Sequence, residues 1–367
     1  MKEVIEGNKV VKAAAWFLCL GAIIALLMFF RSFIQPLALA VILWFLIIEL
    51  RVQFMKLSIR GRSFPKPIWT VISSVTVLYI FYLTTSIIIG NIQNLANNMS
   101  HYTSNLIGLL ETLEKWVNLE NLGERVQQDK SMLVRGMTSV ATQFASVLGQ
   151  FVLILFYVVF MLLEEATFHR KLQIMMDKST GMDAWKSTFD RIYKLFHDYA
   201  TIKVMTSLVT GVISYLILFF TGVELPALWA FIIFLFNFIP SIGSIAATLL
   251  TTVFSLVQFG LDTRVLGIFI GIAFTQVIIG NIVEPRIMGN RLNLSPLIVI
   301  ISLTFWGFIW GVMGMILSVP ITAMLMIIFS QFKDTRNIAI LLSGNGQIAD
   351  RIYDESFQGQ EADKNKQ

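Results

Sequence analysis

Long apolar stretches alternate with shorter polar segments along the whole chain. A membrane-spanning helix needs about 20 mostly apolar residues, because the hydrocarbon layer of a bilayer is roughly 30 Å thick. Continuous runs of this length favour helices over barrel strands, which alternate apolar and polar residues in segments of about 10. The pattern therefore predicts an all-α, polytopic integral membrane protein with about eight hydrophobic spans. These spans lie near residues 13–30, 33–48, 68–90, 146–163, 205–221, 226–259, 265–283 and 297–332.

The basic residues of the loops predict an orientation, because cytoplasmic loops carry an excess of Lys and Arg. Three basic residues precede the first span, five lie in 51–66 and seven lie in 164–204. The long segment 91–140 instead carries four basic residues against five acidic ones. We therefore expect the N-terminus and the two basic loops to be cytoplasmic and segment 91–140 to be extracytoplasmic.

Segment 91–140 also carries an apolar stripe at steps of three and four residues, from Ile92 to Trp116. Such a stripe over about 25 residues predicts an amphipathic helix. The helix either lies on the membrane surface or packs in a bundle or between subunits, and its low charge favours packing. The predicted oligomer interface consists of Leu95, Met99, Tyr102, Leu106, Leu109 and Leu113.

A second stripe, from Trp185 to Tyr199, is aromatic and is flanked by basic residues. Helices of this kind commonly lie in the headgroup layer, so we expect anchoring there, with gating as the alternative role.

These features divide the chain into five parts. The parts are three transmembrane helices in 1–90, the extracytoplasmic helical segment 91–140, a fourth span and a cytoplasmic amphipathic helix in 141–204, a transport core with broken helices in 205–335, and a polar cytoplasmic tail in 336–367.

Two of the apolar runs are too long for one straight span. The run 226–257 has 32 residues, and as one helix it would be about 48 Å long. Its middle contains a proline and a glycine, which predict a break at membrane depth. The run 297–332 has 36 residues with three glycines and one proline, so it is also expected to break. Each run is either a single span or a re-entrant hairpin. The first break supplies Asn237, Pro240, Ser241, Gly243 and Ser244 as candidate residues of a substrate pathway.

Between the two runs, the stretch from Gly280 to Gly289 has the same order of Asn, Pro and Gly as the first break, which is either a structural repeat or a chance match. Paired interrupted segments of this kind are the best indication in a sequence of a transporter binding site. Glu284 is the notable charge here, because a carboxylate near membrane depth is costly and is usually paired or functional. It either forms a helix-end ion pair with Arg286 or acts as a proton or cation relay or a gate. The second break supplies Gln276, Asn281, Glu284, Pro285 and Arg286 as pathway candidates.

Composition excludes other classes of protein. Hydrophobic residues make up 56% of the chain and charged residues 14%, and the mean hydropathy is +0.73. The net charge of +5 suits loops beside anionic lipid, and no basic patch on a soluble domain indicates a nucleic-acid partner. The three histidines are scattered and Cys19 is the single cysteine, so we expect no metal and no cofactor. The expected partners are the lipid bilayer and a small-molecule or ion substrate.

Sequence motifs of hydrolysis are missing from the chain. No Walker A, G-x-S-x-G or H-E-x-x-H sequence occurs. We therefore expect no enzyme, and a transporter of this sequence is expected to be a secondary one or to depend on a partner.

Three stretches together resemble the bacterial autoinducer-2 exporter family of permeases. They are Asn237–Ser244, Glu284–Gly289 with Leu294-Ser-Pro296, and Trp306-Gly307 through Pro320. The resemblance covers roughly residues 10–335. It implies a multi-pass permease of the bacterial inner membrane with both termini cytoplasmic, often a homo-oligomer, with a pentamer as one expected form. Described members of the family export autoinducer-2, and some are similar to sodium(lithium)/proton antiporters. After Tyr199 the chain reads Ala200-Thr201-Ile202-Lys203, where the family pattern has a glycine-containing turn.

Three functions agree with these features. The first is a secondary membrane transporter that exports a small polar solute, autoinducer-2-like by resemblance. The second is a sodium(lithium)/proton antiporter, which needs a titratable group inside the membrane. Glu284 is the main candidate for this group, and Glu164 and Glu165 at the end of the fourth span are poorer ones. The third is a non-transporting membrane scaffold that assembles through the stripe of segment 91–140. Access of water to residues 234–246 separates the scaffold from both transport functions.

Overall fold

The computed structural model of the chain describes residues 2–56, 65–97, 102, 104–109, 112, 151–165, 167–168, 170–171, 182–289 and 292–346. In these residues every regular element is a helix, and extended backbone pairs only in an isolated bridge between Leu294 and Ser343. The prediction of an all-α fold is therefore confirmed.

Five helices in the described part of the chain are long and apolar enough to cross a membrane. They are Arg31–Lys56, Thr188–Phe220, Ile242–Phe259, Thr263–Met288 and Val312–Ser330. Shorter apolar helices, such as Pro226–Phe236 and Pro296–Trp310, accompany them. The chain is therefore a polytopic membrane protein, as predicted.

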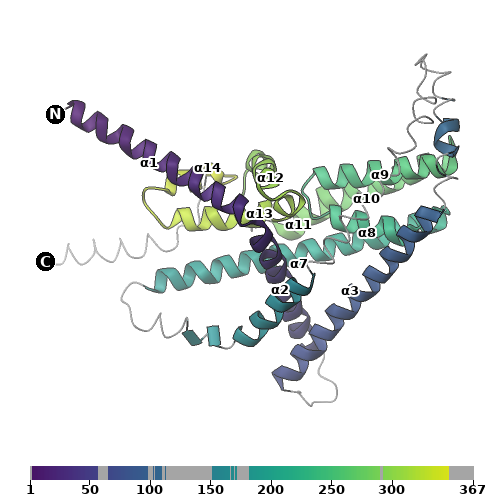
Figure 1. Ribbon diagram of the computed structural model, residues 1–367, viewed down its shortest axis with the longest axis horizontal. Coiled ribbons are helices and arrows are strands. Elements are labelled where there is room, and N and C mark those ends of the chain that lie inside the picture. The colour runs from purple at the N-terminus through teal and green to yellow at the C-terminus, as the bar shows by residue number, and fades with distance from the viewer. Residues whose placement is uncertain are drawn as a thin grey trace. The chain divides into compact units, whose positions relative to one another are not determined.

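The helices gather into two compact units. Unit 1 consists of Met1–Ile42, Leu153–Ile192 and Asn293–Gln367, and unit 2 consists of Leu43–Val152 and Tyr193–Leu292. The helices α2 (Arg31–Lys56) and α7 (Met182–Phe220) are labelled in Figure 1. Each of them contributes residues to both units. The five-part division drawn from hydropathy stays a prediction.

The helix α7 is continuous over 39 residues, which corresponds to about 58 Å. This length exceeds the roughly 30 Å of the hydrocarbon layer. The aromatic stripe from Trp185 to Tyr199 belongs to α7, so this segment is the first part of a long helix and not a separate helix. Its anchoring in the headgroup layer stays a prediction. Residues 200–203, where the family pattern has a turn, are helical as well.

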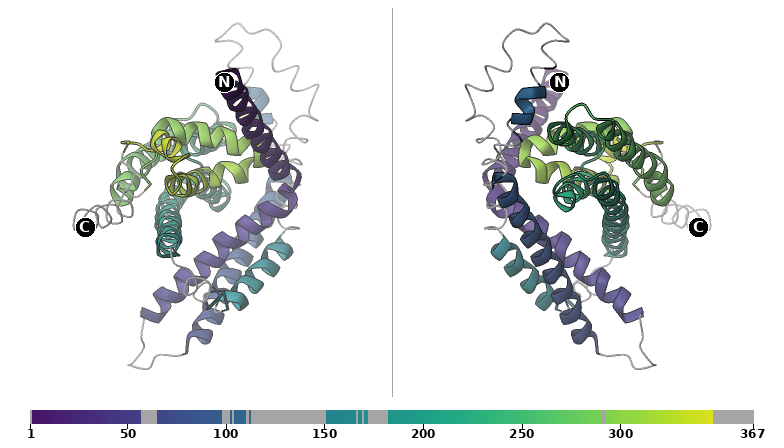
Figure 2. Two further views of the ribbon diagram at one scale, coloured as in Figure 1. Left: turned by 90° about the vertical axis from the view of Figure 1, so that its left-hand side faces the viewer. Right: turned by 90° about the vertical axis from the view of Figure 1, so that its right-hand side faces the viewer.

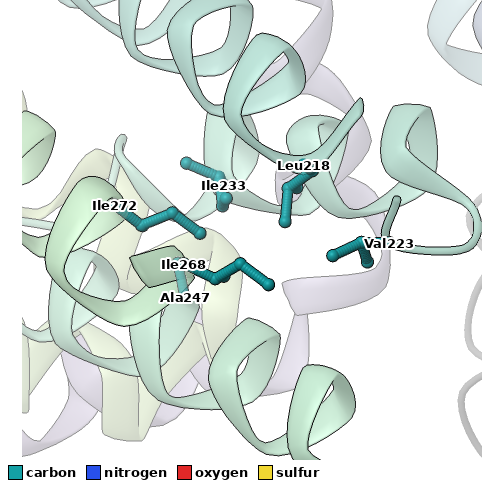
Figure 3. Close-up of a cluster of buried hydrophobic side chains, with 6 residues drawn as sticks. All are labelled: Leu218, Val223, Ile233, Ala247, Ile268 and Ile272. Atoms are coloured by element: carbon teal, nitrogen blue, oxygen red, sulfur yellow. The ribbon is translucent and has the colours of Figure 1, made fainter. Parts of the chain in front are cut away.

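Four helices of unit 2 meet in an apolar core. They are α7, α8 (Pro226–Phe236), α9 (Ile242–Phe259) and α10 (Thr263–Ile278), and α10 continues into the π-helical turn η1 (Ile279–Val283) and α11 (Glu284–Met288). In lipid, close packing takes over from the hydrophobic effect in holding helices together. Figure 3 shows the core side chains Leu218, Val223, Ile233, Ala247, Ile268 and Ile272.

The helices α8 and α9 form a tight antiparallel hairpin. Near the turn, a Cβ added to Gly243 would lie 1.8 Å from the carbonyl oxygen of Phe236. Farther from the turn, the ring centroids of Trp229 and Phe254 lie 4.7 Å apart. With 11 residues, α8 is about 16 Å long, which is roughly half of the hydrocarbon thickness. The run 226–257 is therefore a hairpin with one short arm and not one long span.

The turn of this hairpin lies where the sequence predicts the break. Pro240 has no N–H to continue the helix. Ser241 has a φ of 58°, in a region that non-glycine residues rarely adopt. The hydroxyl of Ser244 donates to the carbonyl oxygen of Ser241 at 2.9 Å and closes the turn.

Unit 1 contains a second hairpin, formed by α12 (Pro296–Trp310) and α13 (Val312–Ser330). The chain turns at Gly311, which has a φ of 63°. A Cβ added to Gly314 would lie 1.8 Å from the carbonyl oxygen of Trp306. A glycine again lets the two arms touch, and the predicted break of the second overlong run is confirmed.

Tryptophan side chains tie the second hairpin to its neighbours in unit 1, which also contains α1 (Lys2–Phe29) and α14 (Arg336–Leu342). Trp306 donates its indole N–H to Thr322 Oγ1 at 3.2 Å. Trp310 donates its indole N–H to the carbonyl of Leu27 on α1 at 3.1 Å, and Gln35 on α2 donates to the carbonyl of Trp310 at 2.7 Å. These bonds satisfy polar groups at a helix end, as the membrane interior requires.

In unit 2 the end of α2 lies beside the start of α3 (Lys66–Asn97), as both views of Figure 2 show. The ring centroids of Phe54 and Trp69 are 6.3 Å apart. Arg51 is buried and donates to Thr70 Oγ1 at 3.2 Å. A hydrogen bond across the two helices thus accommodates a buried guanidinium group.

A short helical segment, 104–109, and Tyr102 before it pack on unit 2 at the open end of the α8–α9 hairpin. Tyr102 donates its hydroxyl to Glu224, and its ring centroid lies 5.5 Å from that of Phe254. Burial, and then the hydrogen bond to Glu224, raises the pKa of Tyr102 above its usual value. Asn105 donates to the carbonyl of Gln258 at 3.4 Å.

The predicted oligomer interface is only partly described by the structure. Tyr102 and Leu109 are buried within this chain, and Leu106 is half-buried. The side chain of Leu95 and the residues Met99 and Leu113 lie outside the described part. The role of the stripe in assembly stays a prediction.

Candidate functional site

A lysine and a glutamate form a buried ion pair in unit 2. Lys203 Nζ lies 2.6 Å from Glu284 Oε1, and the two side chains are 7% and 14% exposed. Both residues belong to helices that are apolar enough to span a membrane. Charges in such helices are rare, because leaving water is costly, and those that occur are paired and mark functional sites. The pair is therefore the centre of the candidate site.

A π-helical turn positions Glu284. The backbone N–H of Glu284 donates to the carbonyl of Ile279, five residues earlier, at the end of η1. A π-turn inserts one residue into a helix and is frequent at functional sites. Pro285 costs the helix no hydrogen bond, because backbone N–H groups in the first turn have no acceptor within the helix and proline lacks this group. This local geometry places the carboxylate against Lys203 of α7.

The tip of the α8–α9 hairpin completes the site. Lys203 Nζ also donates to the backbone carbonyl of Asn237 at 3.2 Å. Asn237 is buried, and its side-chain Nδ2 donates at 3.0 Å to Ser207, one turn after Lys203 on α7. Asn237 ends α8, and the negative end of the helix dipole at this terminus favours a cation.

The structure corrects the predicted partner of Glu284. Within the described residues its ion-pair partner is Lys203, and the nearby Arg286 is exposed. The predicted helix-end pair between Glu284 and Arg286 is therefore wrong. Residues two positions apart do not face each other on a helix, which disfavours that pair. In the sequence, Lys203 counts among the basic residues of 164–204, and nothing there connects it with Glu284.

The remaining pathway candidates have different positions. Pro240, Ser241, Gly243 and Ser244 form the turn that presents Asn237 to Lys203. The last three candidates, Asn281, Pro285 and Arg286, are exposed. The structure thus brings Asn237 and Glu284 together around a residue that the sequence did not single out.

Several buried polar side chains of unit 2 have no hydrogen-bond partner among the described residues, and Gln276 and Tyr199 are two of them. Their unpaired atoms are both amide atoms of Gln276 and the hydroxyl of Tyr199. Gln276 and Tyr199 are each 6% exposed. Tyr199 precedes Lys203 by one turn of α7. An unpaired buried polar group costs about 1–3 kcal/mol, so Gln276 and Tyr199 are candidates for contact with water or a solute.

Outside the spans, Asp262 lies in the loop between α9 and α10. Its Oδ1 accepts a hydrogen bond from the backbone N–H of Arg264 at 2.8 Å and caps α10. Hydrogen bonds from the Arg264 side chain, followed by this backbone bond, lower the pKa of Asp262 to about 2. In the part of the chain that the structure describes, no group of three His, Cys, Asp or Glu residues could hold a metal ion.

A broken helical hairpin whose tip meets a buried ion pair is the architecture of a membrane transporter, because discontinuous helices commonly carry transporter binding sites. Comparison with known families leads to the same class. The family described as AI-2E family transporter matches residues 17–334 of this chain. The chain therefore belongs to the AI-2E transporter family, as its resemblance indicated.

Relatives from other bacteria cover most of the chain. The AI-2 transport protein TqsA of Escherichia coli K12 is 31% identical over 280 residues, which is 75% of this chain and 78% of TqsA. A candidate transport protein of Haemophilus influenzae is 33% identical over 289 residues, which is 75% of this chain and 82% of that protein. A candidate permease of Escherichia coli K12, PerM, is 22% identical over 337 residues, which is 88% of this chain and 94% of PerM. The chain is thus a multi-pass membrane transporter.

Proposed function

We propose that this chain is a secondary transporter that exports a small polar solute across the bacterial inner membrane past the tip of the α8–α9 hairpin. The observation that carries the proposal is the buried ion pair of Lys203 and Glu284 at that tip. A charge pair inside apolar helices is costly, which favours a role in binding or coupling. Broken backbone at membrane depth is tolerated where it is buried or lines a watery cavity.

Autoinducer-2 is the first solute to test, because TqsA is described as an AI-2 transport protein. The buried amide of Gln276 supports a hydroxyl-bearing solute, since an amide offers both hydrogen-bond donors and an acceptor. The proposed pathway adds Lys203 to the predicted set. That set is Asn237, Pro240, Ser241, Gly243, Ser244, Gln276, Asn281, Glu284, Pro285 and Arg286.

The proposed topology places both termini and the loop that follows the span Thr263–Met288 on the cytoplasmic side of the membrane. Two re-entrant hairpins give this arrangement, and the basic loops 51–66 and 164–204 support it. We further propose that copies of the chain assemble into a homo-oligomer, with a pentamer as the expected form. The chain acts without a cofactor and without catalysing a reaction.

Solute flux from proteoliposomes tests the proposal. The purified protein is reconstituted, and efflux of autoinducer-2 and of a panel of furanones, polyols and sugars is followed against protein-free vesicles. We expect saturable efflux of at least one solute. We expect flux to be lost in the paired variant Lys203→Met/Glu284→Gln, which removes both charges.

A matched control comes from the exposed ion pair of Lys171 and Glu164, whose Nζ–Oε1 distance is also 2.6 Å. Lys171→Met/Glu164→Gln should transport like the wild type. If folded protein shows no flux for the whole panel, export of a small polar solute is refuted.

Sodium(lithium)/proton antiport is a second candidate, and the carboxylate of Glu284 beside a lysine favours it. A proton or a metal cation and the Lys203 ammonium would compete for the same oxygen atoms. A pH-sensitive dye inside the vesicles reports proton movement after a pulse of NaCl or LiCl. If Glu284→Gln leaves cation-driven proton movement intact, Glu284 has no role in antiport.

A further inference from the structure

Ser214 on α7 and Gln276 on α10 are buried polar residues with unpaired side chains. The hydroxyl of Ser214 and both amide atoms of Gln276 have no hydrogen-bond partner among the described residues. Ser214 is 0% exposed and Gln276 is 6% exposed. By contrast, Thr210 on α7 and Thr275 on α10 each donate to the carbonyl oxygen four residues earlier at 2.8 Å, as hydroxyl groups in helices often do. Polar groups buried this deeply without a partner indicate a ligand that the chain itself does not supply.

The two residues lie at the same level of unit 2, one turn from the apolar cluster shown in Figure 3. Ser214 precedes Leu218 of that cluster by one turn of α7. Gln276 follows Ile272 of the cluster by one turn of α10. The cluster and the buried ion pair join α7 and the helix of α10 at two levels, which makes the two helices antiparallel. Both steps therefore lead from the cluster toward the ion pair.

The helical spacing turns both side chains into the same space. Residues four positions apart lie on one face of a helix. Ser214 therefore shares the core-facing side of α7 with Leu218. Gln276 shares the core-facing side of α10 with Ile272. Together Ser214 and Gln276 form a polar layer between the apolar cluster and the ion pair.

The polar layer is separate from the ion pair. At about 1.5 Å per residue, Ser214 lies about 16 Å from Lys203 along α7. Gln276 lies about 12 Å from Glu284 along α10 and η1. A solute that binds in the layer therefore leaves the ion pair intact.

The groups of the polar layer favour a neutral solute that carries hydroxyl groups. The hydroxyl of Ser214 offers one donor and acceptor lone pairs, and the amide of Gln276 offers two donors and an acceptor oxygen. A hydroxyl group of a solute both donates and accepts, so it pairs with either residue. A charged solute needs an opposite charge, but Lys203 and Glu284 already neutralise each other.

We propose that Ser214 and Gln276 form a second binding position, which holds the hydroxyl groups of a neutral polyol or sugar and rejects charged analogues of that solute. The inference rests on the proposed export function and adds to it a position outside the ion pair and a selection by charge. The apolar cluster lies on the side of the layer away from the ion pair, so it shields a bound solute from water at that end.

Equilibrium binding to the purified chain tests the proposal without any transport. Binding of tritiated ribitol and ribose is measured by scintillation proximity in detergent. We expect saturable binding of at least one of these neutral solutes. Ribonate and ribitylamine place a negative or a positive charge on the carbon skeleton of ribitol. They should compete at least about tenfold less well than ribitol, because each would bury an unpaired charge.

Two substitutions remove the polar groups of the layer. Gln276→Met should weaken binding about tenfold or more, and Ser214→Ala should weaken it less, because an amide makes more hydrogen bonds than a hydroxyl. Without solute, Gln276→Met should unfold at the same temperature as the wild type or at a higher one, because it removes an unpaired buried group. An amide with a purely structural role, paired to the protein or to a fixed water molecule, would instead lower the unfolding temperature when it is replaced.

Matched controls come from the hydroxyl groups that are already paired. Thr275→Val and Thr210→Val keep the shape of the side chain and remove a hydroxyl that donates to its own helix. Both variants should bind the neutral solute like the wild type. They lie on the same two helices as Gln276 and Ser214, so they report any general effect of substitution there.

The proposal is overturned if the folded wild type binds neither neutral solute, if the charged analogues compete as well as ribitol, or if Gln276→Met binds like Thr275→Val. A lower unfolding temperature of Gln276→Met, or failure to recover it folded, also overturns the proposal. Solute flux separates this inference from the export proposal. Export by the wild type that Gln276→Met leaves unchanged refutes only the second position, and binding that depends on Gln276 without any flux refutes only export.

Discussion

Removing one charge of the Lys203–Glu284 pair should destabilise the protein far more than removing both. At the Nζ–Oε1 distance of 2.6 Å, Coulomb's law with an effective dielectric constant of about 20 gives an attraction of about 6 kcal/mol. Losing one partner leaves the other charge buried and unpaired, which costs about 3–5 kcal/mol. Lys203→Met and Glu284→Gln should each lower the free energy of unfolding by this amount, and the double variant by much less than the sum.

A double-mutant cycle in mixed micelles measures these values. The free energy of unfolding is obtained from reversible denaturation in sodium dodecyl sulfate for the wild type, both single variants and the double variant. The exposed pair of Lys171 and Glu164, with side chains 63% and 53% exposed, serves as the control. Each control variant should change the free energy by about 1 kcal/mol or less. Single variants of the buried pair that behave like these controls, or a double variant with a strictly additive loss, would refute the reasoning.

Three further predictions concern the turn, a loop and assembly. Gly243→Ala would place its Cβ 1.8 Å from the Phe236 carbonyl oxygen and should cost about 3 kcal/mol or more. Gly267→Ala on α10 is the control, because an added Cβ there meets nothing within 4 Å, and it should be neutral or stabilise the protein by up to about 1 kcal/mol. Equal melting temperatures of the two variants would contradict the close approach of Gly243 to Phe236. The pKa of Asp262 is lowered to about 2 from 3.8, so its stabilisation is present above the ordinary pKa and is lost as the pH falls through the folded value. Melting curves between about pH 4 and 2 should therefore fall more steeply for the wild type than for Asp262→Asn, and parallel curves would exclude this contribution. Leu106→Asp should weaken assembly, seen as a lower mass in light scattering, and an unchanged mass would remove the stripe from the interface.

The two helix breaks could be predicted because their causes are local. Pro240 removes a backbone donor wherever it occurs in a helix, and the run around it is too long for one span. Gly243 and Gly314 then act in the same way in two hairpins, since each lets one helix backbone touch the next. Residue type and spacing are sufficient for such features, and no knowledge of distant contacts is needed.

The partner of Glu284 could not be predicted in the same way. Lys203 lies on another helix, and a contact between helices depends on how each is rotated. The π-turn η1 inserts a residue just before Glu284 and changes that rotation. No pattern in the residues 279–283 announces this insertion, so a lysine far along the chain could not be chosen over Arg286.

The continuity of α7 was also hidden in the hydropathy. The change from a polar to an apolar stretch near Lys203 resembles the boundary between a loop helix and a span. No proline interrupts Met182–Phe220, and so the helix continues through that change. The continuity has a consequence for the site, because it carries Lys203 on a regular helix that packs against the hairpin tip.

Protection of a single cysteine by solute tests most directly whether the transport pathway passes the hairpin tip. Ser241→Cys is introduced in a Cys19→Ser background, reconstituted and labelled with a membrane-impermeant thiosulfonate. We expect Ser241→Cys to react from the aqueous phase, and we expect autoinducer-2 or another transported solute to slow the reaction. Leu249→Cys, on an exposed position of α9, should react slowly and without protection. If Ser241→Cys reacts from neither side, or at the same rate with and without transported solute, the hairpin tip does not line the pathway.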